Sequence, residues 1–536
     1  MTDTDGTRRS TGTFPRGAVA TPNHHATAAG RDVLAAGGNA VDAAVAAGLV
    51  LAVVTPYHCG LGGDVLAMVW DGAAHGLLSV GAAPAGAGPE QIRAALDAAI
   101  AAGGPELPSM PGTGGMPDRG ALSVTVPGAV AGWLALLERH GTWSVARVAE
   151  HALRFAEEGV TVSAFAARSV TAARARLGDQ PGWEDAFGGM REGERFVQPA
   201  LARTLRGIVE HGADAFYRGP VAEEIVAVLA EHGSAMTTDD LAAHRVEWVE
   251  PLVGRYRGMD ILELPPPTQG VSVLTALAVL EQLGPLPTDL VEAGHLQVEA
   301  VRAAMADRQE HVGDPATMRT TPAALLEPGR IAAIADAVDR DRAGAWPPAR
   351  PATGGTAYLC AADADGLLIS LIQSNFKGFG SGVVVPGSGF GLHNRGSHLS
   401  LDPADANAIG PRRRPLHTLI PALVLQDGAP RYVMGTMGGD AQAQVHVQLL
   451  GHLLDRGTDV ATAVAAPRFV IDVGDGSVAL EPEAEVTLGA GLTSLGHTVT
   501  TLRDPGLAGH AHVIALGPDG YEVASDPRCD GAAAGI

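Results

Sequence analysis

The stretch Ala352-Thr353-Gly354-Gly355-Thr356-Ala357-Tyr358-Leu359 decides how the rest of the chain is interpreted. Two glycines run directly into a threonine, and that threonine opens a β-like run over 356–362. An Asp-Gly pair at 365–366 then reverses the chain into a second run, 367–374, as expected of a hairpin. If the chain is cut before Thr356, one residue carries both a hydroxyl nucleophile and an α-amine base. A plain junction between a loop and a strand is the alternative interpretation.

Composition excludes several classes of protein. The 536 residues include 37 basic and 59 acidic side chains, and the net charge of −22 argues against binding to nucleic acid or to an anionic membrane. Three cysteines are too few for a disulfide framework and have no metal-ligand spacing, so we predict no metal and no cofactor. The N-terminus has no signal-peptide pattern, and no apolar run reaches the roughly 18 residues of a membrane span. We therefore expect a cytoplasmic protein.

The pattern of the chain changes at Thr356. We expect a disordered tail over 1–16 and then a mostly helical half, in which the helix at 39–54 is apolar nearly all round and should be buried. The proline-rich segment 344–351 should be exposed. Strand-like runs dominate after Thr356, with helices near 442–454 and 460–465. This order predicts sheets packed between helical layers.

Beyond the central stretch, short blocks follow one another in a recognisable order. They are Gly37-Gly38-Asn39-Ala40-Val41-Asp42, Gly60-Leu61-Gly62-Gly63, Leu122-Ser123-Val124-Thr125-Val126-Pro127-Gly128, Phe379-Gly380-Ser381-Gly382, Arg414-Pro415, Gly438-Gly439 and Ala466-Pro467-Arg468-Phe469. Together with the threonine block, they resemble the γ-glutamyltranspeptidase family of N-terminal nucleophile hydrolases over about 430 residues.

The resemblance implies an α+β fold, a four-layer αββα sandwich made as an inactive precursor (a zymogen) that cuts itself between Gly355 and Thr356. The products would be a large subunit, 17–355, and a small subunit, 356–536, which form the fold jointly and could associate as a dimer of heterodimers. Thr356 would be the nucleophile and its amine the base. By family position Ser374 would hydrogen-bond the nucleophile, and the backbone N–H groups of Gly438 and Gly439 would bind the oxyanion.

The sequence departs from the family where the γ-glutamyl group would bind. The carboxylate-pairing arginine of the family is replaced by Val80, and its ammonium-binding aspartate by His398, a possible cation. Other positions of the family's site are also altered. Phe376 replaces an asparagine, although Asn375 is adjacent, and Arg395 replaces a glutamine of the following loop. His417 and Thr418 replace two serines. Arg395 could clamp a carboxylate from a new direction. These six residues, from Asn375 to Thr418, are the predicted substrate contacts.

We therefore expect an autoprocessing threonine hydrolase that attacks an amide or an activated carbonyl next to a carboxylate on a small molecule other than a γ-glutamyl compound. Family branches that hydrolyse oxamate, or that cleave a C–C bond in the biosynthesis of alkylproline antibiotics of the lincomycin and pyrrolobenzodiazepine kind, suggest the chemistry. Two alternatives stay open. The protein could be an ordinary γ-glutamyl hydrolase or transferase acting on glutathione, or an uncleaved relative used for binding.

Overall fold

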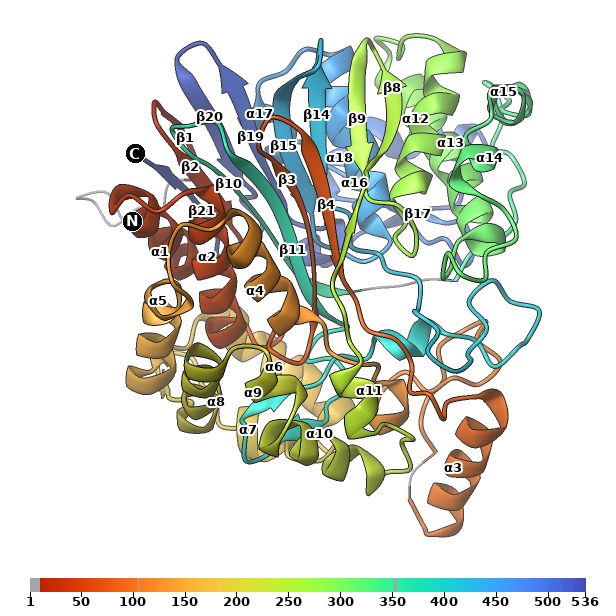
Figure 1. Cartoon of the computed structure of the whole chain (residues 1–536). Helices are drawn as coiled ribbons and strands as arrows, with labels where there is room; N and C mark the ends of the chain where they lie inside the picture. Colours follow the sequence, from red (N-terminus) through yellow and green to blue (C-terminus); the bar gives the residue numbers. More distant parts are fainter. Residues whose placement is uncertain (1–9, 105, 351–353) are drawn as a thin grey trace.

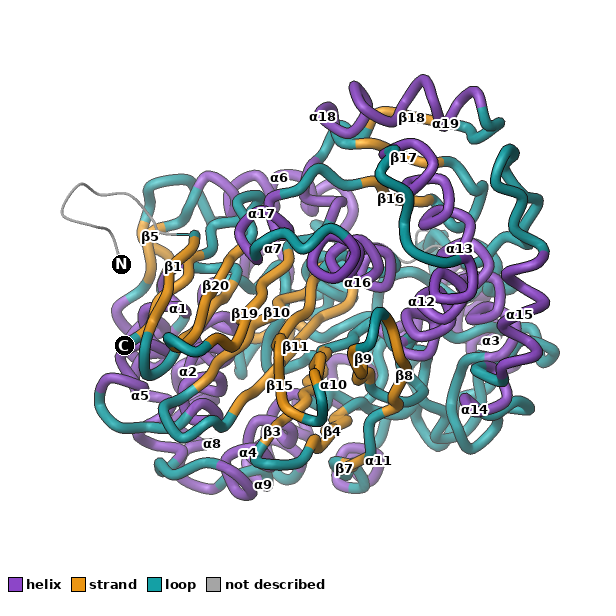
Figure 2. The backbone as a smooth tube through the Cα atoms, turned by 90° about the horizontal axis from the view of Figure 1, so that it is seen from above, coloured by secondary structure: helices purple, strands orange, loops and turns teal. Residues whose placement is uncertain are grey.

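The computed structural model describes residues 10–104, 106–350 and 354–536. In this part of the chain, two seven-stranded sheets lie face to face between two layers of helices (Figure 1, Figure 2). The predicted four-layer αββα sandwich is confirmed. Apolar side chains of both sheets, among them Met68, Tyr358 and Ile514, form the core between them.

The sheet that carries the threonine contains strands from both sides of Thr356. In spatial order its strands are β21 (Ala532–Gly535), β2 (Ala18–Thr21), β10 (Gly355–Ala362), β11 (Leu368–Phe376), β3 (Asp64–Trp70), β4 (Ala74–Ser79) and β7 (Glu247–Val249). The second sheet contains β1 (Thr11–Phe14), β20 (Gly520–Ser525), β19 (Ala511–Gly517), β15 (Ala429–Thr436), β14 (Ala422–Gln426), β9 (Met259–Glu263) and β8 (Leu252–Tyr256). Because each sheet contains strands from both sides of Thr356, neither half can complete a sheet alone.

Two groups of helices cover the outer faces of the sheets. The first sheet packs against α1 (His24–Ala35), α2 (Ala40–Val54), α4 (Ala129–His140), α5 (Val145–Glu158) and α8 (Pro199–His211). The second packs against α12 (Gly270–Leu283), α13 (Leu290–His311), α16 (Ala441–Leu450) and α17 (Val460–Ala465). Every residue of α2 is buried, as its apolar pattern predicted, and Asn39 and Asp42 form a capping box at its start.

The remaining elements extend from the sandwich. They are α3 (Pro89–Ala101), α6 (Ala164–Leu177), α7 (Trp183–Phe187), α9 (Asp214–Tyr217), α10 (Pro220–Ala230), α11 (Thr238–Ala242), α14 (Pro322–Leu325), α15 (Pro328–Asp336), α18 (Pro482–Ala484), α19 (Ala490–Ser494), and the short strands β5 (Val160–Thr161), β6 (Arg195–Phe196), β12 (Val384–Val385), β13 (Phe390–Gly391), β16 (Phe469–Ile471), β17 (Val478–Leu480) and β18 (Val499–Thr501). A 3₁₀ turn spans Arg395–His398, and a π-helical turn at Gly451–Asp455 extends α16. No helix of the described residues is long and apolar enough to cross a membrane.

Two expectations about exposed segments are corrected. The tail expected to be disordered over 1–16 contains β1, whose residues pair with β20, and its residues 1–9 lie outside the described part. In the proline-rich segment, Ala345, Pro347 and Pro348 are exposed as expected, but Ala349 and Arg350 are buried, and Pro351 is not described. Residues 11–14 are ordered by pairing with β20, and Arg350 is ordered by the hydrogen bonds of its buried guanidinium. Neither contact was visible from local composition.

Candidate active site

Thr356 lies at the start of β10, opposite Ser374 of β11. The two hydroxyl oxygens are 3.1 Å apart, and the Ser374 hydroxyl donates to the Gly355 carbonyl at 2.8 Å. The Ser374 hydroxyl has one proton and donates it to the Gly355 carbonyl. In the contact between the two hydroxyls, Thr356 is therefore the donor. The N–H of Phe376 in turn donates to Ser374 Oγ at 2.8 Å. The pairing of Thr356 with Ser374 thus brings a hydroxyl donor to the carbonyl that precedes the threonine.

The glycines before Thr356 are required by close packing. A Cβ on Gly355 would lie 2.7 Å from the Tyr57 carbonyl oxygen, and one on Gly354 would lie 3.0 Å from the Phe376 carbonyl oxygen. Gly355 does not have a positive φ, so backbone conformation is not what selects glycine there. Ordinary side chains are excluded because neighbouring backbone occupies their space.

Gly438 and Gly439 form the turn between β15 and α16. Their φ angles, +128° and +64°, favour glycine, and their carbonyls accept the first hydrogen bonds of the helix. Among the described residues no acceptor contacts either of their N–H groups. The nitrogen of Gly439 is 3.4 Å from the Cβ position of Gly354, so these free donors lie beside the chain that leads into Thr356.

Arg395 is a buried cation on the Phe376 side of this site. Its guanidinium carbon lies 3.9 Å from the centre of the Phe376 ring, and Nη1 donates to Thr418 Oγ1 at 3.3 Å. Its Nε has no hydrogen-bond partner, and no carboxylate of the described residues lies within 4.0 Å of the guanidinium. Burial lowers the pKa of Arg395 to about 9, although Asp64 and Asp440 oppose the shift.

Asp64 and His393 adjoin Arg395 and were not among the predicted site residues. Asp64 opens β3 opposite Ser374, and its Oδ2 lies 3.4 Å from His393 Nδ1 and 3.7 Å from His417 Nε2. Burial raises the pKa of Asp64. The sequence contained one signal for Asp64 as a site residue. It is a lone charged residue directly after the Gly60–Gly63 block and directly before an apolar run.

His398 and His417 are uncharged. Burial first, and then the neighbouring arginines, among them Arg395, lower the pKa of both imidazoles well below the usual value. The expectation of a cation at position 398 is therefore wrong, because the positive charge belongs to Arg395 and to Arg350. The His398 ring packs against Phe376 at 5.7 Å, and its backbone carbonyl accepts from Arg350 Nη1 at 2.8 Å.

A second guanidinium network supports the glycine turn from behind. Arg308 on α13 donates to Asp440 and, at 2.7 Å, to Gln269 Oε1. The Gln269 amide nitrogen donates to the carbonyls of Thr418 and Gly439, at 2.9 and 3.2 Å. This network links the glycine turn to the Arg395 cluster. Nothing in the local sequence distinguishes Arg308, within α13, or Gln269, just before α12, from other residues of the chain.

The structure brings together most of the predicted site residues. Phe376, Arg395, His398, His417 and Thr418 share one buried cluster next to Ser374. Asn375 is different, because its amide nitrogen donates to the Pro56 carbonyl at 3.3 Å and its side chain packs against the Gly60–Gly63 turn. On the other side of the cut site, Gly354 and Gly355 line a cleft of about 420 Å³ with Tyr57, His58, Lys377 and Arg176.

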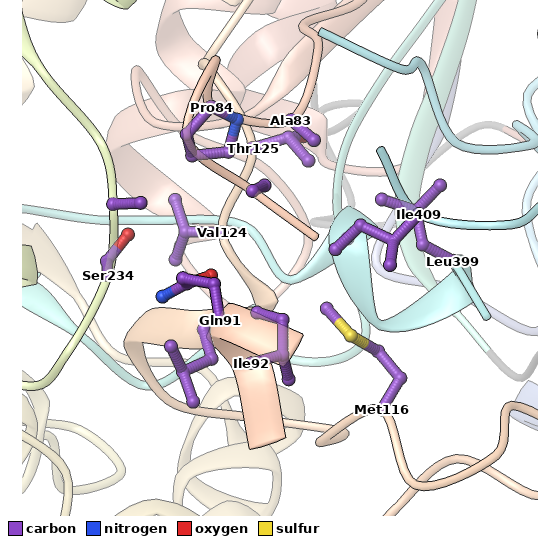
Figure 3. Close-up of a pocket in the computed structure, with 14 residues that line it drawn as sticks. Ala83, Pro84, Gln91, Ile92, Met116, Val124, Thr125, Ser234, Leu399 and Ile409 are labelled. Atoms are coloured by element: carbon purple, nitrogen blue, oxygen red, sulfur yellow. The ribbon is translucent and has the colours of Figure 1, made fainter. Parts of the chain in front are cut away.

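A second hollow, next to the Arg395 turn, is too small for a substrate. It lies under α3, where Ile92, Met116, Val124 and Leu399 surround a space of about 10 Å³ (Figure 3). A volume of that size holds about one water molecule. We therefore regard this hollow as part of the packing that holds the turn.

The uncharged histidines predict that acid destabilises the protein. Burial lowers the pKa of His58 and of His512 to about 3, and His398 and His417 behave alike. Below pH 6.5 these histidines take up protons in the unfolded chain but not in the native state. Each of them therefore lowers the free energy of unfolding by about 1.4 kcal/mol for every pH unit below 6.5. Urea unfolding of the uncut chain between pH 7 and 5 should show this loss, with a smaller slope in His512→Phe and an unchanged one in exposed His232→Asn. A flat profile would contradict the assignment.

Comparison with known proteins gives one consistent result. The family model described as gamma-glutamyltranspeptidase matches residues 26–536. The oxamate amidohydrolase proenzyme of Klebsiella pneumoniae is 35% identical over 97% of this chain and 98% of its own, and the glutathione hydrolase-like YwrD proenzyme of Bacillus subtilis is 36% identical over the same shares. The crystal structure of cephalosporin acylase from Bacillus halodurans superposes with a TM-score of 0.90 at 36% identity, covering 99% of this chain and 97% of that one.

Proposed function

The chain belongs to the γ-glutamyltranspeptidase family and is an N-terminal nucleophile hydrolase, and from this premise we propose that Thr356 cuts the precursor and then hydrolyses a small carboxylate-bearing substrate. The substrate is an amide, or another activated carbonyl, other than a γ-glutamyl compound. The observation that carries this proposal is the buried Arg395, whose Nε has no hydrogen-bond partner and whose guanidinium has no carboxylate of the described residues within 4.0 Å.

Self-cleavage needs only groups that surround the Gly355–Thr356 bond. Thr356 Oγ attacks the Gly355 carbonyl carbon while the Ser374 hydroxyl, 2.8 Å from the carbonyl oxygen, stabilises the developing charge. The C–N bond breaks, the hydroxyl proton ends on the Thr356 nitrogen, and an ester remains. Water then hydrolyses the ester and leaves the Gly355 carboxylate and a free Thr356 amine.

Gly355→Ala tests the packing at the cut site. Its methyl group would lie 2.7 Å from the Tyr57 carbonyl, and relief of such an overlap typically costs 1–3 kcal/mol. We expect cleavage to slow about 10- to 100-fold, measured by the appearance of the two fragments on denaturing gels. Gly189→Ala is the control, because a Cβ there meets nothing within 4 Å. Equal rates in the two variants would exclude the packing argument.

The mature enzyme would reuse the same atoms. Thr356 Oγ attacks the substrate carbonyl, the α-amine takes the hydroxyl proton, and the N–H groups of Gly438 and Gly439 hold the oxyanion. The amine returns the proton to the leaving nitrogen, and water releases the acid from the acyl ester. Asn375 is the weakest of the proposed substrate contacts, since its side chain is turned toward the Gly60–Gly63 loop.

The Arg395 cluster supports a carboxylate substrate. A buried guanidinium without an ion-pair partner costs several kcal/mol, which the carboxylate of a bound substrate would repay. His398 stands where the family has its ammonium-binding aspartate, and as a neutral imidazole it offers no negative charge to a substrate ammonium. This arrangement supports oxamate-like substrates above γ-glutamyl compounds. C–C bond hydrolysis in antibiotic biosynthesis uses the same nucleophile and oxyanion donors and is the second form of the proposal.

A substrate panel tests the proposal directly. The cleaved enzyme should release ammonia from oxamate, or from a related 2-oxo or dicarboxylic monoamide, with kcat/KM at least tenfold above that for γ-glutamyl-p-nitroanilide. A neutral oxamide analogue is the matched control for the carboxylate. The alternative, an ordinary γ-glutamyl hydrolase or transferase, predicts the reverse order.

A further inference from the structure

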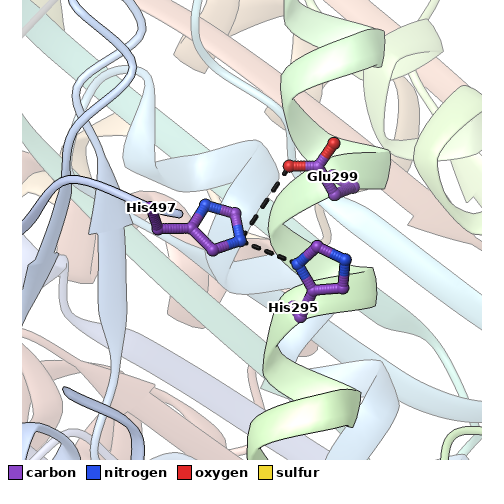
Figure 4. Close-up of side chains that lie close together, drawn as sticks. All are labelled: His295, Glu299 and His497. Atoms are coloured by element: carbon purple, nitrogen blue, oxygen red, sulfur yellow. Dashed lines mark hydrogen bonds and ion pairs between the residues drawn. The ribbon is translucent and has the colours of Figure 1, made fainter. Parts of the chain in front are cut away.

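Three buried side chains outside the active site converge on one point. His295 and Glu299 lie one turn apart on α13, and His497 comes from the loop that precedes β18 (Figure 4). His295 Nδ1 is 2.7 Å from His497 Nε2, which is 4.0 Å from Glu299 Oε1. Among the described residues, this is the one group of three His, Cys, Asp or Glu side chains whose ligand atoms all lie within 4.8 Å of one another.

Neighbouring groups already orient two of the three side chains. His295 Nε2 donates to the Asp339 carbonyl at 2.7 Å, which leaves the Nδ1 lone pair facing His497. Glu299 Oε2 accepts from Trp346 Nε1 at 2.7 Å and from the N–H of Gly344 at 3.0 Å, which leaves Oε1 facing the same point. Outer contacts of this kind fix the ligands of metal sites.

The tautomer of His497 decides whether its Nε2 can act as a ligand. Because His295 Nδ1 can only accept in this tautomer, His497 Nε2 must donate to it. His497 Nδ1 is then a buried acceptor, and it has no partner. A change of tautomer would move this proton to Nδ1 and free the lone pair of Nε2, the atom that faces His295 and Glu299, as a ligand.

We propose that His295 Nδ1, His497 Nε2 and Glu299 Oε1 bind a divalent transition-metal cation, with Zn²⁺ the best match. Two imidazoles and one carboxylate form a known three-ligand set for zinc, with water in the fourth position. Zinc–nitrogen bonds of about 2.0–2.1 Å in tetrahedral geometry place the two nitrogens about 3.3 Å apart, so the His497 loop must recede by about 0.6 Å. Arg302, whose Nη1 is 3.4 Å from Glu299 Oε1, would share that carboxylate with the cation.

The site would join the two products of the cut. His295 and Glu299 precede Thr356, whereas His497 follows it. A cation bound by both segments would therefore hold the large and small subunits together where no peptide bond links them. The binding itself does not depend on cleavage or on catalysis, so it can be tested whatever the substrate is.

Metal binding to the untagged full-length protein tests the proposal. After chelator treatment and dialysis, the protein is titrated with Zn²⁺ by calorimetry, and with Co²⁺, whose visible spectrum reports tetrahedral coordination. We expect one Zn²⁺ per chain. His497→Gln and Glu299→Gln, which can keep a hydrogen bond but not the ligand set, should bind Zn²⁺ at least ~100-fold more weakly. His232→Gln, at an exposed histidine, should bind as the parent does.

Two results would overturn the proposal. One is the absence of stoichiometric Zn²⁺ binding by the parent protein. The other is unchanged affinity in both His497→Gln and Glu299→Gln. Circular dichroism and the extent of self-cleavage show whether these variants are folded, and the Co²⁺ spectrum of the parent gives a readout that does not depend on either of them.

Discussion

Thr356→Ala should remain a single chain of 54.6 kDa and lose hydrolytic activity by at least 10⁴-fold. The parent should separate under denaturing conditions into fragments of 355 residues and the remaining 181 of 536. The reason is that Thr356 supplies the hydroxyl for self-cleavage, and its amine becomes the general base only after the cut. Intact-mass spectrometry measures the first effect, and ammonia release from oxamate measures the second.

Thr356→Ser is the matched control, because it keeps the hydroxyl and, once cut, the amine. It should still be processed, and its fragments should have the same boundary. A parent protein that stays uncut after prolonged incubation would contradict the mechanism and would favour the alternative of an uncleaved binding protein. Cleavage of Thr356→Ala at the same bond would show that another group is the nucleophile.

Arg395→Met should reduce kcat/KM for a carboxylate substrate by about 10²- to 10³-fold, since loss of one partner of a buried charge pair costs roughly 3–5 kcal/mol. It should do so without loss of stability in the free enzyme. The guanidinium is buried without a carboxylate within 4.0 Å, so an apolar side chain of similar length removes a desolvation cost instead of a salt bridge. Steady-state kinetics and urea unfolding measure the two effects separately.

The controls for Arg395→Met concern charge and substrate. Arg412→Met removes an exposed arginine and should leave both kinetics and stability unchanged. The neutral oxamide analogue should be hydrolysed equally by the parent and by Arg395→Met. If Arg395→Met lost activity equally on the charged and the neutral compound, Arg395 would be a structural residue and the carboxylate-binding part of the proposal would fail.

Much of the sandwich was predictable from local patterns. The helix over 460–465 and the hairpin after Thr356 follow from apolar spacing and from the Asp-Gly turn. The helix has the predicted bounds, and the strands of the hairpin differ from the predicted ones by one or two residues at their ends. The burial of α2 follows from its uninterrupted apolar sequence. The ordering of residues 11–14 was missed, because an edge strand with polar composition is ordered by its partner, β20, and not by its own pattern.

The candidate site was predictable only as a set of residues. Thr356, Ser374 and the Gly438-Gly439 pair followed from the family resemblance, and the structure places them close together. Asp64 and Arg308 were missed, because a charged residue on a strand or a helix is ordinary until its neighbours are known. Asn375 was placed among the substrate contacts, but the alternation of side chains along β11 turns it away from Ser374.

By itself, the sequence determined the nucleophile block, the hairpin that carries it, the alternation of sheets and helical layers, and the membership of the chain in its family. Only the tertiary structure decided the charge state of the site. His398 is neutral and Arg395 carries the charge, because segments far apart in the chain remove water from both. They place no carboxylate within 4.0 Å of the guanidinium, although Asp64 and Asp440 lie near enough to favour its charge. The requirement for glycine at 355 was decided in the same way, by the backbone of Tyr57. Patterns of sequence record local preference, whereas desolvation and close contact depend on which distant residues fold against a group.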